Sequence, residues 1–187
     1  ERAVLVDRRV PVVEPVDHLD GDAVAVGVEV VGEEAGRVDL AKAFAASLTA
    51  VPAGALPTSG SFYVPAYSQV VRSVGGVAIP FSVTLTIHNV SETRPLVLGR
   101  IAYFDTAGSL VDSYLKAPIA LKPLATLQLS IPVTDARGGA GANFLVDWAA
   151  DGAIAEPAVE ALMLGSIGNA TYSFVSVGRP TREAGTR

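Results

Sequence analysis

The sequence predicts an all-β protein: an antiparallel, immunoglobulin-like β-sandwich with an N-terminal extension that carries a strand and, as a further expectation, a short helix. Three observations support this fold class. Half of the 187 residues are hydrophobic and only 18% are charged, which favours a sizeable core and argues against disorder over most of the chain. Apolar and polar residues alternate in several segments, as in half-buried strands. Turn signals separate these segments at short intervals, and no segment has the length and periodicity of a long helix.

The alternation is clearest in residues 81–89 and 124–133. In the first segment Phe81, Val83, Leu85 and Ile87 are predicted to share one face, opposite Ser82, Thr84, Thr86 and His88. The second segment repeats the pattern through Leu127, Leu129 and Ile131. Further strands are expected at 62–71, 96–105, 109–115, 143–148, 158–164 and 172–177, which gives about eight strands in about 120 residues, the spacing of a sandwich.

The chain divides into three parts. Residues 1–61 form an N-terminal arm and linker, residues 62–180 the sandwich, and residues 181–187 a C-terminal tail. In the arm, valines at every second position of 24–30 predict a strand, and Asp39 before Leu40 predicts the cap of a short helix. Because the arm is rich in Val and Ala, we expect it to dock on the sandwich or to join two copies as a homo-oligomer.

Composition excludes several classes of function. A net charge of −5 and a pI near 5.0 argue against nucleic-acid binding. The chain has no cysteine, which excludes disulfides, zinc–thiolate sites and thiol catalysis, and only two histidines. No apolar run approaches the length that spans a membrane, so we expect no transmembrane segment.

Two catalytic signatures are approached but not met. Asp105-Thr-Ala-Gly108 departs from the Asp-Thr-Gly signature of aspartic proteases by one inserted Ala, and a hairpin turn accounts for it. Leu164-Gly-Ser-Ile-Gly168 lacks the spacing of a serine-hydrolase nucleophile elbow by one residue. We therefore do not expect a protease or a serine hydrolase.

The sharpest site hypothesis concerns Asp147 and Glu160. If 143–149 and 158–164 form a hairpin across Asp151-Gly152, Trp148 and Val159 face inward and the two carboxylates lie opposite each other on the other face. Opposed carboxylates repel, so an arginine, a shared proton or a divalent cation should offset them. Arg137 and Arg179 are the arginine candidates. An ordinary salt-bridged outer face is the simpler interpretation, and a register slip of one residue would separate the pair.

Residues 137–143 form a second candidate site. The loop of Gly138, Gly139 and Gly141, between Arg137 and Asn143, offers backbone amides and a guanidinium that could hold an anion. A plain inter-strand connection, with glycines that supply positive φ, is the alternative. In addition to Asp147 and Glu160, His88 is a third candidate for binding a metal ion. It is a weak candidate because it has no acidic or His neighbour at ligand spacing.

The aromatic residues Phe62, Tyr63 and Tyr67 stand near Pro65 in a strand that a proline suits to a sheet edge. Aromatic side chains are enriched at protein interfaces, so they are candidates for a recognition platform. They could equally fill the core.

Four stretches, 63–68, 138–148, 160–165 and 176–180, together resemble a family of exported bacterial proteins classified only as a domain of unknown function. The first reads Tyr-Val-Pro-Ala-Tyr-Ser and the second Gly-Gly-Ala-Gly-Ala-Asn-Phe-Leu-Val-Asp-Trp. The likeness covers about residues 62–180. It implies a compact β-domain and an exported location, periplasmic or lipid-anchored at the envelope, and it assigns no activity.

The preferred functional hypothesis is a non-catalytic exported module that binds a ligand, a protein partner or the cell envelope. The rival is a metal-assisted or carboxylate-based enzyme that uses Asp147 and Glu160, with Arg137, Asn143 and Arg179 as orienting groups. No cofactor is predicted under the first hypothesis, and a divalent cation is required only by one form of the second.

Overall fold

The computed structural model describes residues 38–71 and 75–182. The predicted Val24–Val30 strand, and with it the idea that the arm joins two copies, lie outside the described residues. The described residues all belong to one compact unit, Gly36–Arg187.

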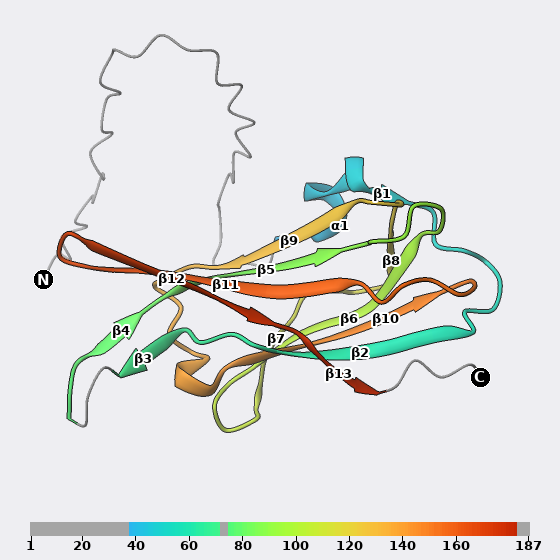
Figure 1. The fold of residues 1–187 in the computed structure, drawn as a ribbon. Helices are drawn as coiled ribbons and strands as arrows, with labels where there is room; N and C mark the ends of the chain where they lie inside the picture. Colours follow the sequence, from blue (N-terminus) through green and yellow to red (C-terminus); the bar gives the residue numbers. More distant parts are fainter. Residues whose placement is uncertain (1–37, 72–74, 183–187) are drawn as a thin grey trace, which may run out of the picture. The chain divides into compact units, whose positions relative to one another are not determined.

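Two antiparallel sheets make up most of the described chain (Figure 1). The seven-stranded sheet has the order β1 (Leu48–Thr49), β8 (Ile119–Leu121), β6 (Leu96–Phe104), β10 (Asn143–Ala150), β2 (Thr58–Pro65) and β13 (Arg179–Arg182), with β7 (Leu110–Ser113) paired to β6. The four-stranded sheet has the order β12 (Ala170–Val177), β11 (Ala158–Ile167), β5 (Ser82–His88) and β9 (Thr126–Ile131). A small separate hairpin pairs β3 (Gln69–Val71) with β4 (Ala78–Pro80).

The core lies between the two main sheets. In β5 every second residue is buried, as the alternation predicts, and β9, β10 and β11 follow the same rule. The inward side chains of both sheets form one cluster, in which Trp148 of β10 and Val159 of β11 are 2% and 3% exposed. The antiparallel β-sandwich is therefore confirmed, whereas its immunoglobulin-like character stays a prediction.

The N-terminal boundary of the sandwich differs from the predicted one. β2 begins at Thr58, inside the segment interpreted as a linker, so Ser59, Gly60 and Ser61 belong to the sheet. β2 is also a central strand, between β10 and β13, and Pro65 is its last residue rather than a mark of an edge. Because a proline at the end of a strand removes no internal ladder hydrogen bond, it is tolerated there.

The short helix is where the sequence places it, although it is only one turn long. α1 spans Leu40–Ala43, and the Asp39 side chain accepts hydrogen bonds from the backbone N–H groups of Ala41 and Lys42. A 3₁₀ turn, η1 (Ala45–Ser47), follows. Leu40 is 2% exposed and belongs to the core, so this part of the predicted arm packs with the sandwich.

Candidate functional site

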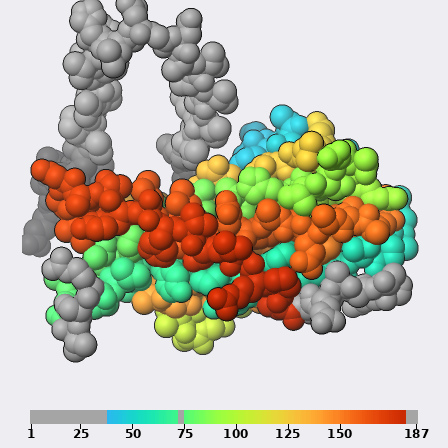
Figure 2. Space-filling view, viewed as in Figure 1, coloured from blue at the N-terminus to red at the C-terminus, as the bar shows by residue number. Residues whose placement is uncertain are grey.

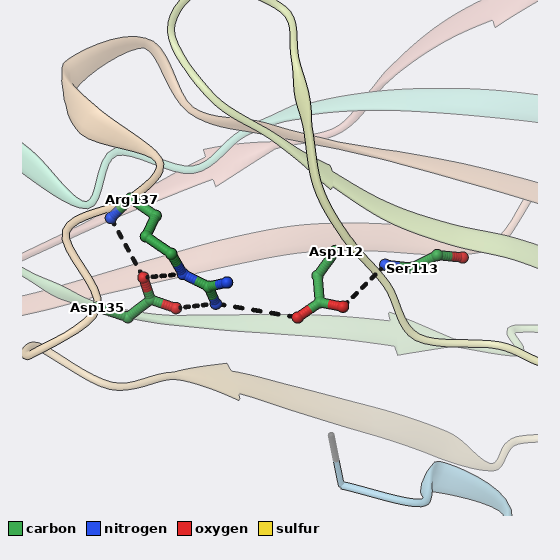
Figure 3. Close-up of polar contacts among 4 residues, drawn as sticks. All are labelled: Asp112, Ser113, Asp135 and Arg137. Carbon is green, nitrogen blue, oxygen red and sulfur yellow. Dashed lines mark hydrogen bonds and ion pairs between the residues drawn. The ribbon is translucent and has the colours of Figure 1, made fainter. Parts of the chain in front are cut away.

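A charged cluster at the β9–β10 connection contains the first of the predicted site residues. Arg137 donates from Nε and Nη2 to the two carboxylate oxygens of Asp135, at 2.8 and 2.6 Å, and its backbone N–H bonds Asp135 Oδ1 (Figure 3). Its Nη2 lies 3.9 Å from Asp112 Oδ2, on β7. The Asp135 and Asp112 side chains are only 15% and 14% exposed, whereas Arg137 is 59% exposed. One exposed guanidinium thus forms ion pairs with two largely buried carboxylates from different segments.

The electrostatics of the cluster follow from this geometry. Hydrogen bonding from Arg137 holds the pKa of the Asp135 carboxyl below its usual value, against a smaller opposing effect of burial. The Asp135 carboxylate in turn raises the pKa of Arg137. Burial raises the pKa of the nearby Tyr114 phenol, and the charges of Asp112 and Asp135 raise it further. At neutral pH the Arg137–Asp135 ion pair is therefore fully charged and Tyr114 is a neutral phenol.

Tyr103 of β6 lies beneath the same loop. The residue is completely buried, its ring packs 4.9 Å from that of Phe144, and its hydroxyl has no hydrogen-bond partner among the described residues. Burial raises the pKa of this hydroxyl, more than the nearby Ser68 lowers it. A Cβ at Gly138 would come within 2.0 Å of the Tyr103 oxygen. Glycine is therefore required at 138 by close packing and not by a positive φ, because its φ is −70°.

The predicted anion cradle does not form. Residues Gly139–Gly141 make a single 3₁₀ turn, η2, in which Gly139 N–H bonds Ala136 O and Gly141 N–H bonds Thr106 Oγ1. Those two amides are engaged by the protein, and the guanidinium of Arg137 is held by acids. The prediction of free amides was wrong because the sequence does not reveal that Thr106, on the β6–β7 turn, closes over the loop and also bonds Gly138 O.

What this cluster can do chemically is limited. Charge-assisted hydrogen bonds hold Arg137 to Asp135 within the β9–β10 connection. A longer ion pair, 3.9 Å from Arg137 Nη2 to Asp112 Oδ2, links that connection to β7. Among the described residues there is no group of three or more His, Cys, Asp or Glu that could hold a metal ion. We interpret the cluster as a structural set of ion pairs that holds the β9–β10 connection against β7.

The Asp147/Glu160 hypothesis is contradicted by the topology. β10 and β11 do not form a hairpin: β10 pairs with β2 and β6, whereas β11 pairs with β12 and β5 in the other sheet. Asp147 stands between the buried Val146 and Trp148, and Glu160 between the buried Val159 and Ala161. Both carboxylates therefore point away from the core, on opposite outer faces of the sandwich.

The real partner of Asp147 is Arg100. The Arg100 Nε lies 2.8 Å from Asp147 Oδ2, and Ser61 Oγ donates to Asp147 Oδ1 at 2.5 Å. A β-bulge makes this pairing, since Asp147 opposes Arg100 while Trp148 opposes Leu98, and Gly99 is the extra residue. The bulge places Leu98 and Ile101 in the core on either side of the outward-facing Gly99 and Arg100. Sequence alternation alone cannot locate such an insertion, so Arg100 was missed and Arg137 and Arg179 were named instead.

The remaining single-residue candidates lie apart from one another. His88 Nδ1 is 2.9 Å from Thr126 Oγ1, on the neighbouring strand of the four-stranded sheet. Asn143 Nδ2 bonds Gly141 O at 3.4 Å. Arg179 lies on β13 opposite Tyr63. The structure brings together Arg137, the loop glycines and Asn143, and separates these from Asp147, Glu160, His88 and Arg179.

The aromatic platform is also not formed as predicted. Phe62 is 5% exposed and belongs to the core, whereas Tyr63, the next residue in the strand, is 37% exposed on the outer face. Tyr67 is half-buried, with its ring 6.0 Å from that of Phe174 on β12. Tyr67 alone therefore remains next to a surface that sequence reasoning missed.

That surface is the β11–β12 hairpin, shown in orange and red in Figures 1 and 2. It exposes large apolar side chains on both of its faces, at 37 to 67% of their area. We call this set the hairpin surface: Leu162, Leu164, Tyr172, Phe174, Val175 and Val177. The sequence signal that could have located it is a run without charge, because residues 161–178 contain no Asp, Glu, Lys or Arg. Contiguous apolar surface of this kind marks interaction sites.

None of the helices among residues 38–71 and 75–182 has the length and hydropathy to cross a membrane.

Comparison with known proteins places the sandwich in a family. The chain is similar to the solved structure titled "Crystal Structure of Thermotoga maritima 1070", with 12% identity and a TM-score of 0.40, over 67% of this chain and 96% of that one. This similarity is too low to support any inference. No curated protein matches the chain. The model of the family described as "Protein of unknown function (DUF3124)" matches residues 59–181, which begin at the second residue of β2 and end within β13. The chain therefore belongs to this family.

Proposed function

We propose that the protein is a non-catalytic exported module that binds a polypeptide partner through the hairpin surface. The observation that carries the proposal is that an apolar hairpin, uncharged from residue 161 to residue 178, lies at a sheet edge that no described strand pairs with. An unpaired edge strand offers backbone donors and acceptors to an extended segment of another chain, and flanking side chains supply specificity.

The rest of the molecule supports binding over catalysis. The carboxylate pair of the rival enzyme hypothesis is divided between two outer faces, so no geometry remains for a shared proton or a bridging ion at Asp147 and Glu160. The Arg137 cluster is held by its own salt bridges. The exported location is part of the proposal and rests on the resemblance to exported bacterial proteins.

Site-specific photo-cross-linking in bacteria that export the full protein tests this proposal. A benzophenone amino acid replaces Val175, on the outer face of β12, and in the control it replaces Gln128, on the same outer face at the opposite edge of the sheet. We expect a polypeptide adduct, identified by mass spectrometry, from position 175 and not from 128, and its loss when Leu162→Lys is added. If position 175 yields no polypeptide adduct, or position 128 yields the same one, the proposal is wrong.

A further inference from the structure

β12 has one hydrogen-bonded neighbour among the described strands. It pairs with β11 from Ala170 to Val177, and no described strand pairs with its other side. In an antiparallel strand successive residues direct their N–H and C=O groups to opposite sides, so every second residue of β12 presents its backbone groups at the open edge.

Two other edge strands, β13 and β9, are protected, whereas β12 is not. β13 follows β12 directly through Gly178 but belongs to the other sheet, and it carries Arg179, Pro180 and a bulge at Thr181. Proline, charge and bulges are the devices by which natural sheets prevent edge-to-edge pairing. β9, the opposite edge of the same sheet, has none of these devices within the strand, but it exposes only polar residues such as Gln128 and Ser130. Among the described strands of the two main sheets, β12 combines an unpaired edge, no charge and several exposed large apolar side chains.

We propose that the partner at this edge is a second copy of the chain. Two β12 strands pair antiparallel about a two-fold axis and join the two four-stranded sheets into one continuous sheet. This inference rests on the proposed function and names its partner. A strand pair of this kind uses the same edge in both copies, so the assembly closes as a dimer.

Charge favours self-pairing at this place. Each copy carries a net charge of −5, so two copies repel over most of their surface. Residues 161–178 are the exception because they carry no charge, and two such strands meet without like charges in register. Exposed apolar residues then meet their own kind, including Val175 and Val177 on the outer face and Tyr172 and Phe174 on the core-facing side.

The side-chain pattern restricts the register. Phe174 pairs with the buried Met163 and so faces the core side, whereas Val175 pairs with Leu162 and faces outward. If the two core-facing layers lie on the same side of the joined sheet, even-numbered residues of one β12 oppose even-numbered residues of the other. One residue then lies on the two-fold axis, directly opposite its own copy.

The size of the contact predicts its strength. Eight residues of strand are about 26 Å long. With flanking side chains, such an edge contact falls near or below the roughly 1,200 Å² at which specific interfaces are usually stable. We therefore expect a weak dimer, with a dissociation constant on the order of micromolar to tens of micromolar, that forms and dissociates with concentration.

Sedimentation equilibrium of the full chain from about 1 to about 500 µM tests the inference, since this range brackets the expected dissociation constant. The wild type should change from monomer to dimer mass over this range. Val175→Lys should weaken the dimer at least tenfold because it buries two ammonium groups in the contact. Gln128→Lys places the same charge on the other edge strand and should leave the dissociation constant unchanged. Both positions are solvent-exposed in the single chain, so at concentrations below the dissociation constant we expect both variants to keep the melting temperature of the wild type.

A cysteine scan locates the axis. The chain has no cysteine, so single substitutions at Thr171, Ser173 and Val175 give clean probes. The yield of disulfide-linked dimer should be highest with the cysteine at one of these positions or at an adjacent residue of β12. It should decrease as the cysteine is moved away from that position in either direction along the strand. A dimer that is equally sensitive to both lysine variants, or a scan without a maximum, would place the contact elsewhere and overturn the inference.

A wild type that stays monomeric to 500 µM also overturns it. That result leaves the proposed function intact if Val175 still cross-links to a different, identified polypeptide in cells. If neither the dimer nor an adduct forms, both fail.

Discussion

Substituting Gly138 by Ala tests how tightly the β9–β10 connection is packed on Tyr103. The backbone at Gly138 is in the right-handed helical region, so alanine causes no backbone strain. Its Cβ, however, would lie 2.0 Å from Tyr103 Oη and 2.6 Å from Ala142 Cβ. Both neighbours are buried, and the Tyr103 ring is held against Phe144. Overpacking of this kind costs about 3 kcal/mol, the upper part of its usual range, because neither neighbour can move into solvent.

The assay is reversible unfolding in urea, with thermal unfolding as a second probe. A loss of about 3 kcal/mol should lower the melting temperature by roughly 6–12 °C in a protein of this size. Gly54→Ala is the matched control: no atom lies within 4 Å of the position that its new methyl group would occupy, and φ is not positive, so we expect a change within about 0.5 kcal/mol, or a small gain.

Adding Tyr103→Phe completes a double-mutant cycle. This change removes the oxygen nearest to the new methyl group. That hydroxyl lies near the Ser68 side chain but makes no hydrogen bond of standard geometry among the described residues, so little is lost. Tyr103→Phe should therefore be nearly neutral alone and should recover about 1 kcal/mol or more in the Gly138→Ala background. A loss below about 1 kcal/mol for Gly138→Ala, or no recovery in the double variant, would refute the reasoning.

Three further predictions concern single contacts. Asp135→Asn should destabilise the protein by about 1 kcal/mol at pH 7. Because Arg137 lowers the folded-state pKa of Asp135, this contribution is present above the unfolded pKa of about 4 and is lost as the pH falls through the lowered value; urea midpoints of variant and wild type should therefore converge toward pH 2. If the difference between the two urea midpoints instead increases as the pH falls, the ion pair does not cause the destabilisation. Leu124 has φ +58° and is 67% exposed, so Leu124→Gly should stabilise by about 0.5–1 kcal/mol, and a lower melting temperature would show that this turn is not strained. Asp147→Asn should cost about 1 kcal/mol by weakening the partly exposed pair with Arg100, and a double-mutant cycle with Arg100→Ala that gives no coupling would contradict that pairing.

Local patterns were predicted well because they depend on neighbouring residues alone. The inward faces of β5 and β9 follow from alternation, and Asp39 caps α1 as its position before Leu40 indicates. The Asp105–Gly108 turn is also present, with Gly108 at φ +82° and its N–H bonded to Asp105 O.

Which strands pair could not be predicted in the same way. β10 and β11 both alternate and are separated by Asp151-Gly152, the signature of a hairpin. The connection instead crosses from one sheet to the other, with Asp151 bonded to Arg94 at 2.9 Å and Ile154 packed against the core. The error moved Glu160 to the wrong sheet. Arg100 was hidden for a related reason, since one extra residue at Gly99 shifts the phase of β6.

The hairpin surface was missed because the sequence patterns of β11 and β12 are those of ordinary sandwich strands. Met163 and Val159 of β11 do face the core, but the odd-numbered residues of β12 and the even-numbered residues of β11 do not. Whether the outer face of a strand is covered depends on the other sheets and chains around it. The absence of charge over residues 161–178 was visible in the sequence, although its position at an open edge was not.

Residue-resolved amide exchange of β12, measured by NMR, tests the pairing at its open edge most directly. Alternate residues from Ala170 to Val177 direct their N–H groups toward β11 and toward the open edge. In the wild type at a concentration well above the dissociation constant, we predict slow exchange for both sets of amides. In Val175→Lys the edge-directed amides should exchange rapidly, while the amides bonded to β11 stay protected. Rapid exchange of the edge-directed amides in the concentrated wild type, or their protection in a sample of monomer mass, would contradict pairing of β12 with a second copy.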